Sequence, residues 1–295
     1  MISIIICSIN KNFAQQVQEN IAATIGVVWE PIIIDNTQSP KSITQVYNIG
    51  AAKANHDILC FVHEDILFQT LNWGAKIVDA FKRDGELGLI GVAGAKYKSK
   101  TPSGWYTGFK ELDCCNISHL NKAGEKENIY FNPIPGSLTQ PVIVLDGVFM
   151  CCPKNVWAAV KFDEILLTDF HLYDLDFSIR VAEKHKVVVT FEIDIVHITK
   201  GGHYGNQWLE STLLWHKSVQ KELPVYVPGI NLKRKIFERR ILQTWLIRLK
   251  HEDINFYNKL HWLWGIRIWV HISAWPFVVL FMVKSFFEKR LPNNN

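Results

Sequence analysis

The chain has 295 residues, 48% of them hydrophobic and 20% charged, which is enough for one large domain or two smaller ones with a real core. The formal net charge is +4, but 12 Lys and Arg against 4 Asp and Glu lie between Tyr226 and the end, so residues 1–225 are mildly acidic. This distribution argues against a nucleic-acid groove across the body and predicts an anionic surface as partner of the basic C-terminal segment.

The cysteines and the N-terminal residues indicate the cellular compartment of the protein. The 6 cysteines form no CxxC pair and no metal-finger spacing. Cys7 and Cys60 lie in apolar runs, where we expect free thiols that act as small hydrophobes. A reducing cytoplasm is the simplest compartment for such thiols. The N-terminus has no basic lead and no long apolar core, so we interpret it as a strand and not as a signal peptide.

The first part of the chain alternates apolar β-branched runs with helical patterns. We expect strands at residues 2–7, 31–34, 57–62 and 87–93, and helices that follow Asn10 and span 41–54 and 73–83. This alternation predicts βαβ units, and therefore a parallel sheet flanked by helices. Three strands end in succession on polar residues, so these should share one edge of the sheet: Cys7-Ser8, Asp35-Asn36 and His63-Glu64-Asp65. Open α/β sheets bind ligands at that edge.

The middle of the chain is less regular. Residues 96–140 are rich in Gly, Pro, Asn and Ser, which predicts a long functional loop with only short strands. A strand at 141–145 should lead into Asp146-Gly147, and a helix should begin at Tyr173. A further strand at 187–195 precedes His197. Trp208 and Trp215 fall on one face of the next helix, and this spacing predicts core packing.

The C-terminal segment, residues 226–295, has a different composition. Basic residues alternate with apolar ones from Lys233 to Lys250, which predicts a basic amphipathic helix. The charge-free run from Ile268 to Val283 has 16 residues. At about 1.5 Å per residue it is roughly 24 Å long, short of the approximately 30 Å of a bilayer core. We therefore expect apolar helices that lie on a membrane or re-enter it.

Asp65 is the firmest candidate for chemistry. A carboxylate at the carboxyl end of a buried strand is a suitable ligand for a hard cation such as Mg²⁺. The alternative for Glu64 and Asp65 is a helix N-cap, and the alternative for Asp35 and Asn36 is turn formation. Arg180 should be a structural ion-pair partner.

Five motifs in order resemble those of the family 2 group of inverting nucleotide-sugar glycosyltransferases, which have the A-type fold. The resemblance covers Ile2 to about Lys217. The motifs are Ile32-Ile33-Ile34-Asp35-Asn36, Tyr47-Asn48-Ile49-Gly50-Ala51-Ala52, Phe61-Val62-His63-Glu64-Asp65, Asp146-Gly147-Val148-Phe149 and Tyr173-Asp174-Leu175-Asp176. The resemblance implies a Rossmann-like, mostly parallel sheet in a catalytic domain at residues 1–225. His63 stands where the family has the first Asp of its Asp-x-Asp motif.

The resemblance also implies roles for individual residues. Asp174 matches the general base, and Asp65 matches the acid that holds Mg²⁺ or Mn²⁺, with His197 or His203 as a late histidine ligand. Contacts with the donor are implied for Asp35, Asn36, Asn48, His63, Glu64, Asp146 and Gly147. Trp105, Tyr106 and Asp176 are candidates for the acceptor side.

We therefore expect a metal-dependent enzyme that transfers a sugar from a nucleotide diphosphate-sugar to an acceptor hydroxyl, with inversion. The acceptor would be a saccharide or lipid-linked, in surface polysaccharide or glycolipid assembly, and the enzyme would be cytoplasmic and peripheral to the inner face of the membrane. One alternative is a catalytically silent module that binds nucleotide-sugars or membranes. A sugar nucleotidyltransferase is a weaker one, because Ser8 to Asn12 is not a glycine-rich phosphate loop.

Overall fold

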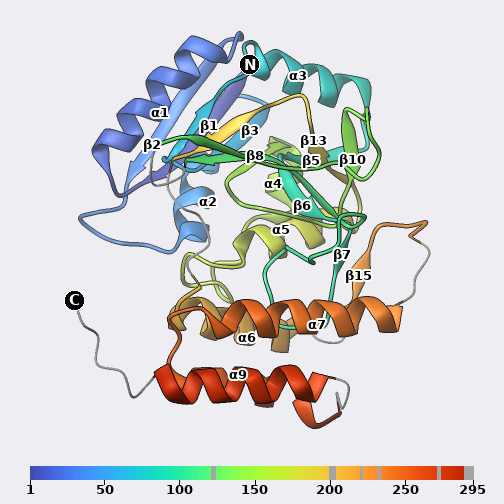
Figure 1. Cartoon of the computed structure of the whole chain (residues 1–295). Coiled ribbons are helices and arrows are strands. Elements are labelled where there is room, and N and C mark those ends of the chain that lie inside the picture. The colour runs from blue at the N-terminus through green and yellow to red at the C-terminus, as the bar shows by residue number, and fades with distance from the viewer. Residues whose placement is uncertain (121–123, 199–203, 220–221, 231–233, 271–273, 289–295) are drawn as a thin grey trace.

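The computed structural model describes residues 1–120, 124–198, 204–219, 222–230, 234–270 and 274–288 (Figure 1). Its largest element is a sheet of 7 strands in the order β10-β13-β5-β12-β3-β1-β2. The strands are β1 (Ile2–Ser8), β2 (Trp29–Asp35), β3 (Ile58–Val62), β5 (Leu87–Gly91), β10 (Thr139–Pro141), β12 (Phe149–Pro153) and β13 (Lys186–Thr190). The expected mixed architecture of strands and helices is confirmed.

The sheet is mixed and not mostly parallel, which corrects the expectation. β1, β2 and β3 run parallel to one another, and β13 runs parallel to β5. β12 is antiparallel to both of its neighbours, β3 and β5, and β10 is antiparallel to β13. The strand–helix pattern that licensed the parallel prediction ends at residue 91, and β12 enters the sheet from the irregular part of the chain.

Helices cover both faces of this sheet because strand side chains alternate between two apolar clusters. Ile5 and Phe61 belong to the face covered by α2 (Ile43–Lys53), α4 (Lys154–Val160) and α5 (Tyr173–Ala182). Ile4 and Val62 belong to the face covered by α1 (Lys11–Thr24) and α3 (Trp73–Arg83). α1 begins as the sequence predicts, since the Asn10 side chain accepts hydrogen bonds from the backbone N–H groups of Asn12 and Phe13.

A second sheet contains His197, one of the candidate metal ligands. Its order is β11-β6-β8-β14-β4, and β9 pairs with β8. The strands are β4 (Ile66–Phe68), β6 (Ala93–Ala95), β8 (Asp113–Leu120), β9 (Lys126–Phe131), β11 (Val144–Leu145) and β14 (Ile195–His197). The long strands β8 and β9 correct the expectation of a loop with short strands at 96–140. A small ladder joins β7 (Tyr97–Lys98) to β15 (Val225–Tyr226).

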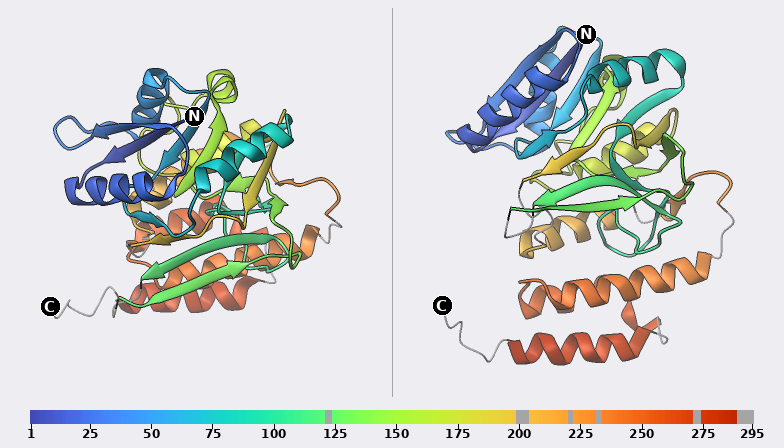
Figure 2. Two further views of the ribbon diagram at one scale, coloured as in Figure 1. Left: turned by 90° about the horizontal axis from the view of Figure 1, so that it is seen from above. Right: turned by 45° about the horizontal axis from the view of Figure 1, so that its top comes forward.

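The C-terminal helices pack on the body of the protein. They are α6 (Asn206–Val219), α7 (Arg234–Lys250), α8 (Phe256–Gly265), the short 3₁₀ helix η1 (Ile268–Val270) and α9 (Trp275–Glu288). α7 lies between α9 and the sheets (Figures 1 and 2). Trp245 of α7 and Trp262 of α8 are fully buried in the same cluster as Phe61 of the main sheet. The change of composition at residue 226 is therefore not a break in packing.

The packing changes the interpretation of the basic amphipathic segment. Phe237, Ile241 and Trp245 are buried against the body of the protein. Ile236 and Ile247 of the same helix are exposed. Trp208 and Trp215 are core residues, as predicted. No helix in the described ranges is long and apolar enough to cross a membrane.

One cysteine differs from expectation. The antiparallel register of β12 and β3 sets Cys151 directly opposite Cys60, and the two form a disulfide. Cys60 is therefore not a free thiol in this structure. The sequence did not predict this pair, because the two cysteines lie 91 positions apart.

Candidate functional site

The three strand ends meet at one edge, as predicted. Ser8 is paired with Asp35, and Ile6 is paired with both Ile33 and Val62, so β1, β2 and β3 all end there. A cavity of about 490 Å³ opens beside this edge, lined by Ser8, Lys11, Ala14, Gln15, Gln18, Glu19, Ile33 and Asp35. A cavity at the carboxyl ends of parallel strands is suited to a small polar ligand.

Asp35 and Asn36 shape the rim of this cavity differently. Asp35 is exposed and accepts hydrogen bonds from the backbone N–H and hydroxyl of Thr37, which hold the pKa of its carboxyl below the ordinary range. The Asn36 side chain is bonded to both backbone groups of Lys41 and closes the loop. The turn interpretation therefore describes both residues. Only Asp35 also lines the cavity.

Glu64, which follows β3, forms hydrogen bonds with the residues at the end of β1. Its carboxylate accepts hydrogen bonds from the Ser8 hydroxyl at 2.8 Å and from the backbone N–H groups of Ile9 and Asn10 at 3.2 and 3.1 Å. These contacts fix the loop that leads from β1 into α1. Glu64 therefore positions one wall of the cavity.

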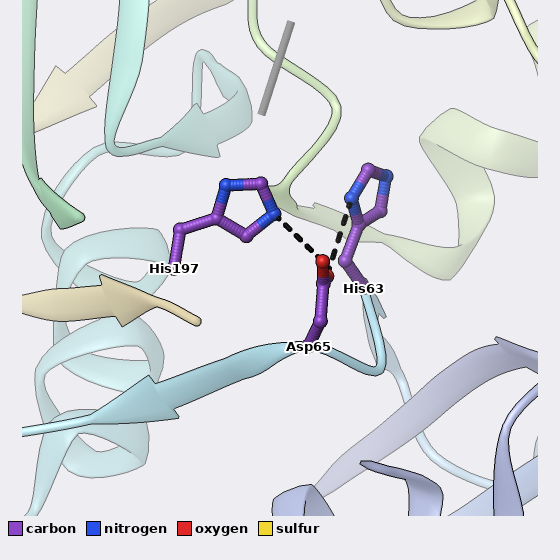
Figure 3. Close-up of side chains that lie close together, drawn as sticks. All are labelled: His63, Asp65 and His197. Atoms are coloured by element: carbon purple, nitrogen blue, oxygen red, sulfur yellow. Dashed lines mark ion pairs between the residues drawn. The ribbon is translucent and has the colours of Figure 1, made fainter. Parts of the chain in front are cut away.

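His63, Asp65 and His197 form a group that can hold a metal ion (Figure 3). The His197 Nε2 atom lies 3.1 Å from one Asp65 oxygen, and the His63 Nδ1 atom lies 4.0 Å from the other. The three ligand atoms all lie within 4.8 Å of one another. β14 pairs with β4 so that His197 stands opposite Ile66, next to Asp65, which explains how residues from distant parts of the sequence converge. His203, the other candidate histidine, lies outside the described residues.

Tyr173 sets the tautomer of His63. The Tyr173 hydroxyl donates to the carbonyl of Gly147 at 3.2 Å, so its oxygen accepts from the Nε2–H of His63 at 2.8 Å. The Nδ1 atom then carries the lone pair, on the side that faces Asp65. Burial lowers the pKa of His63, which keeps the imidazole neutral, the form that binds metals.

Asp174 is a half-buried carboxylate at the start of α5. It accepts hydrogen bonds from the backbone N–H of Gly147 and from its own helix at Leu175, both at 2.9 Å. Burial, assisted by the negative charge of Asp146, raises the pKa of Asp174 to about 7. A carboxyl that titrates near neutral pH suits proton transfer. Gly147 is required here, since a Cβ at this position would overlap with the Tyr173 hydroxyl.

Asp146 is held by its neighbours and by a tryptophan. Its two oxygens accept from the backbone N–H of Val148 at 2.9 Å and from the indole N–H of Trp105 at 2.6 Å. Trp105 and Tyr106 are half-buried and packed against each other, with ring centroids 5.9 Å apart. Trp105 thus positions Asp146, a contact that the sequence did not predict.

Two predicted site residues have structural roles. The Asn48 amide donates to Phe162 and Glu164 and accepts from the indole of Trp157. These bonds hold the segment after α4 in place and leave no free polar atom for a nucleotide-sugar. Asp176 is buried and bonded to Trp215 and Arg180, so it is not available to an acceptor. Their bonding partners lie far away in the sequence, so these structural contacts could not be predicted from it, and a binding role for either residue stays a prediction. Arg180 is the structural ion-pair partner that we expected.

Neither Tyr173 nor Phe170 was predicted from the sequence to be a site residue. Tyr173 stood in one of the five motifs, without a role, and its bond to His63 spans 110 positions. Phe170 is half exposed, and its ring centroid lies 5.6 Å from that of His63. The sequence signal that could have indicated Phe170 is an aromatic residue three positions before Tyr173, where the motif helix begins.

The fold is that of the A-type glycosyltransferases. A crystal structure of GalNAc-T7 with UDP, GalNAc and Mn²⁺ superposes with a TM-score of 0.53 at 10% identity, over 75% of this chain and 47% of that one. This chain therefore spans about half the length of that structure. The crystal structure of A197 from STIV gives a TM-score of 0.38 at 9% identity, over 68% of this chain and 86% of that one.

A family model assigns the chain more closely. Residues 3–218 match the model described as "Glycosyltransferase like family", and the chain belongs to this family. No curated protein matches. The matched range contains the metal-binding group and Asp174, and it ends before α7.

Proposed function

We propose that this chain is a metal-dependent, inverting glycosyltransferase that moves a sugar from a nucleotide diphosphate-sugar to an acceptor hydroxyl. One observation carries the proposal. The metal-binding group and the half-buried base are coupled, because His63 bonds to Tyr173, Tyr173 bonds to Gly147, and Gly147 bonds to Asp174. A general base and a cation site held in one network are what a displacement at a diphosphate-sugar requires.

The residues of the metal-binding group fit a divalent cation. One carboxylate and two imidazoles, with Nδ1 of His63 and Nε2 of His197 turned toward Asp65, form a donor set that suits Mn²⁺ better than Mg²⁺. When bound, such an ion supplies charge neutralisation for the departing diphosphate. Tyr173 holds His63 in the tautomer that this binding requires.

Asp174 takes the proton from the acceptor hydroxyl as that oxygen attacks the sugar. The Gly147 and Leu175 N–H groups aim its carboxylate. Its pKa of about 7 makes it a stronger base than an exposed aspartate and leaves much of it ionised at neutral pH. Asp146 lies beside it and, held by Trp105, faces the side on which we place the sugar. The cavity beside Asp35 would receive the nucleoside.

Transfer assays with a panel of UDP-, GDP- and TDP-sugars test the proposal, with Mn²⁺ or Mg²⁺ present. The wild-type protein should turn over at least one donor. Asp174→Asn should lose turnover and keep donor binding, whereas Asp35→Asn should weaken donor binding. Donor binding by the wild type without any turnover would instead identify the silent module. Unchanged turnover in Asp174→Asn would remove Asp174 as the base.

We further propose that the C-terminal helices rest on the inner face of a membrane, which would bring the enzyme to a lipid-linked acceptor in surface polysaccharide or glycolipid assembly. Large exposed apolar side chains are concentrated there: Tyr257, Leu260, Trp264, Trp269, Trp275, Val279, Leu280 and Val283. A cavity of about 460 Å³ on α7 is lined by Lys235, Ile236, Arg239, Arg240 and Gln243, and three of these are cationic. An apolar aromatic surface beside cations suits an anionic bilayer.

Vesicle sedimentation tests this surface with substitutions, because removing α7 would delete the fully buried Trp245, uncover Trp208 beneath it and unfold the body. Trp264→Ser with Trp275→Ser should reduce binding to vesicles that contain an anionic phospholipid. The control is Leu71→Ser with Ile165→Ser, which removes two exposed apolar side chains from the body. Equal loss in both double variants, or none in the first, would contradict the membrane assignment.

A further inference from the structure

Arg248 lies on α7, outside the matched family range, in a cluster of aromatic rings. Its guanidinium carbon is 4.4 Å from the ring centroid of Tyr204, 5.4 Å from that of Trp245 and 5.7 Å from that of Tyr106. Trp245 is fully buried, and it stacks on Trp208 with centroids 5.5 Å apart. These rings fix the position of a half-buried cation.

The same aromatic cluster leads to the catalytic residues. The Trp245 indole donates to the backbone carbonyl of Tyr106 at 3.0 Å. The neighbouring residue Trp105 donates to Asp146 at 2.6 Å. One short backbone segment thus contacts Arg248 through the Tyr106 ring and Asp146 through the Trp105 ring.

The electrostatics of Tyr204 agree with this placement. Burial is the largest cause that raises the pKa of Tyr204 to about 12, and Arg248 opposes it. Asp146 and Asp174 raise the same pKa, so both carboxylates are near enough to act on it. The Arg248 cation, which stacks on the Tyr204 ring at 4.4 Å, and the two acids of the site thus act on the same side chain.

The N–H groups of the Arg248 guanidinium have no hydrogen-bond acceptor among the described residues. Among the described residues, none forms an ion pair or a hydrogen bond with the guanidinium of Arg248, and the backbone carbonyl of Arg248 accepts from His251 within α7 and the turn after it. Glu252 also lies near Tyr204 but forms no ion pair with Arg248. Arg180 is different, because its three guanidinium nitrogens are bonded to Asp176, Val160 and Lys161. A guanidinium that is stacked by its faces keeps its N–H fork for an anion, and phosphate matches this fork.

We propose that Arg248 is an anion-binding residue of the active site and that it takes a phosphate group of a substrate. The phosphate would belong either to the diphosphate of the donor or to a lipid phosphate of the acceptor. This inference deepens the proposed function and rests on it. It also gives the C-terminal helices a second role, because α7 would then contribute a substrate contact.

The test measures binding to the full-length protein by calorimetry, with inorganic pyrophosphate as the first probe and a chelator to remove metals. Arg248→Gln should weaken pyrophosphate binding by about tenfold or more, because a charge-assisted, bidentate contact is lost. Arg248→Lys keeps the charge without the fork and should lie between the two. The control is Arg83→Gln on α3, an exposed arginine whose Nε donates to the backbone carbonyl of Asp79 at 3.3 Å and which lies outside the site. This exposed cation should change the affinity by less than about twofold.

Two further probes identify the source of the phosphate. UDP, GDP and TDP represent the donor, and dodecyl phosphate represents a lipid-linked acceptor. A loss in Arg248→Gln that is confined to one of these classes supports the proposal and names its source. The proposal is overturned if folded Arg248→Gln and Arg83→Gln bind all of the probes equally, or if the wild type does not bind pyrophosphate. Because no turnover is measured, a failure here is distinct from a failure of transferase activity.

Discussion

Neutralising Asp174 should change stability and activity in opposite directions. The carboxyl is half-buried, and desolvation raises its pKa from the ordinary 3.8 to about 7 in the folded protein. Below pH 3.8 the group is protonated in both the folded and unfolded states, so it imposes no charge penalty. The penalty grows as the pH rises toward about 7 and is constant above that value. Asp174→Asn removes this penalty and also removes the base.

The size of the effect follows from the pKa. At 1.36 kcal/mol per pH unit, the ionised carboxylate costs the folded state about 4 kcal/mol above pH 7. Asparagine keeps one acceptor oxygen for the two N–H donors, Gly147 and Leu175, and loses about 1 kcal/mol with the other bond. The variant should therefore be more stable than the wild type by roughly 3 kcal/mol near pH 8, which corresponds to a rise in Tm of several degrees. Near pH 5 the gain should vanish.

Calorimetric Tm values at about pH 5 and pH 8, with transfer rates at each pH, measure both effects. The wild-type rate should fall about tenfold per pH unit below the pKa, because only the ionised base accepts a proton. The control is Asp176→Asn, two residues away, which breaks a buried ion pair with Arg180 and should destabilise the protein by about 3 kcal/mol. If Asp174→Asn lowers the Tm near pH 8 and retains transfer, the assignment of a half-buried base is wrong.

Three other changes test the network around the site. Tyr173→Phe removes the hydrogen bond that fixes His63 and should weaken Mn²⁺ affinity by about 10–100-fold, measured by calorimetry; unchanged affinity would show that the tautomer is set elsewhere. Gly147→Ala places a Cβ against the Tyr173 hydroxyl and should cost about 1–3 kcal/mol of unfolding free energy by urea denaturation. Trp245→Ala should cost about 3–5 kcal/mol in the same measurement and melt the whole protein in one transition; an independent transition of the C-terminal helices would contradict a shared core.

The edge formed by β1, β2 and β3 could be predicted because local signals determine it. Apolar β-branched runs alternate with helical patterns, and parallel strands necessarily place Asp35 and Asp65 at the same end of the sheet. The alternation also predicted the helices on both faces. Asp174 stands at the start of a helix, as its motif indicated. Each of these inferences needs only neighbouring residues and the direction of the chain.

The remaining features depend on contacts that cross the sequence. Asn48 has the composition of a binding residue, but its partners lie more than 100 positions away, at Trp157 and Phe162. β8 has the sequence DCCNISHL, in which polar and apolar residues do not alternate, so its pattern did not predict a strand. α7 shows the composition of an interfacial helix, and only the fold reveals that Trp245 packs against the body. In each case tertiary contacts overrode the local pattern.

His63 illustrates how such contacts give a departure from a motif a physical meaning. Among the three residues of the metal-binding group, His63 contributes an imidazole whose pKa is lowered by burial, so the group carries a single carboxylate, Asp65. A divalent ion held by that group would keep a net positive charge, which favours a diphosphate as a further ligand. The imidazole performs this role only in one tautomer, and Tyr173 selects it through a bond to the carbonyl of Gly147. We therefore expect His63 and Tyr173 to act as a pair, so that replacing either one alone impairs metal binding.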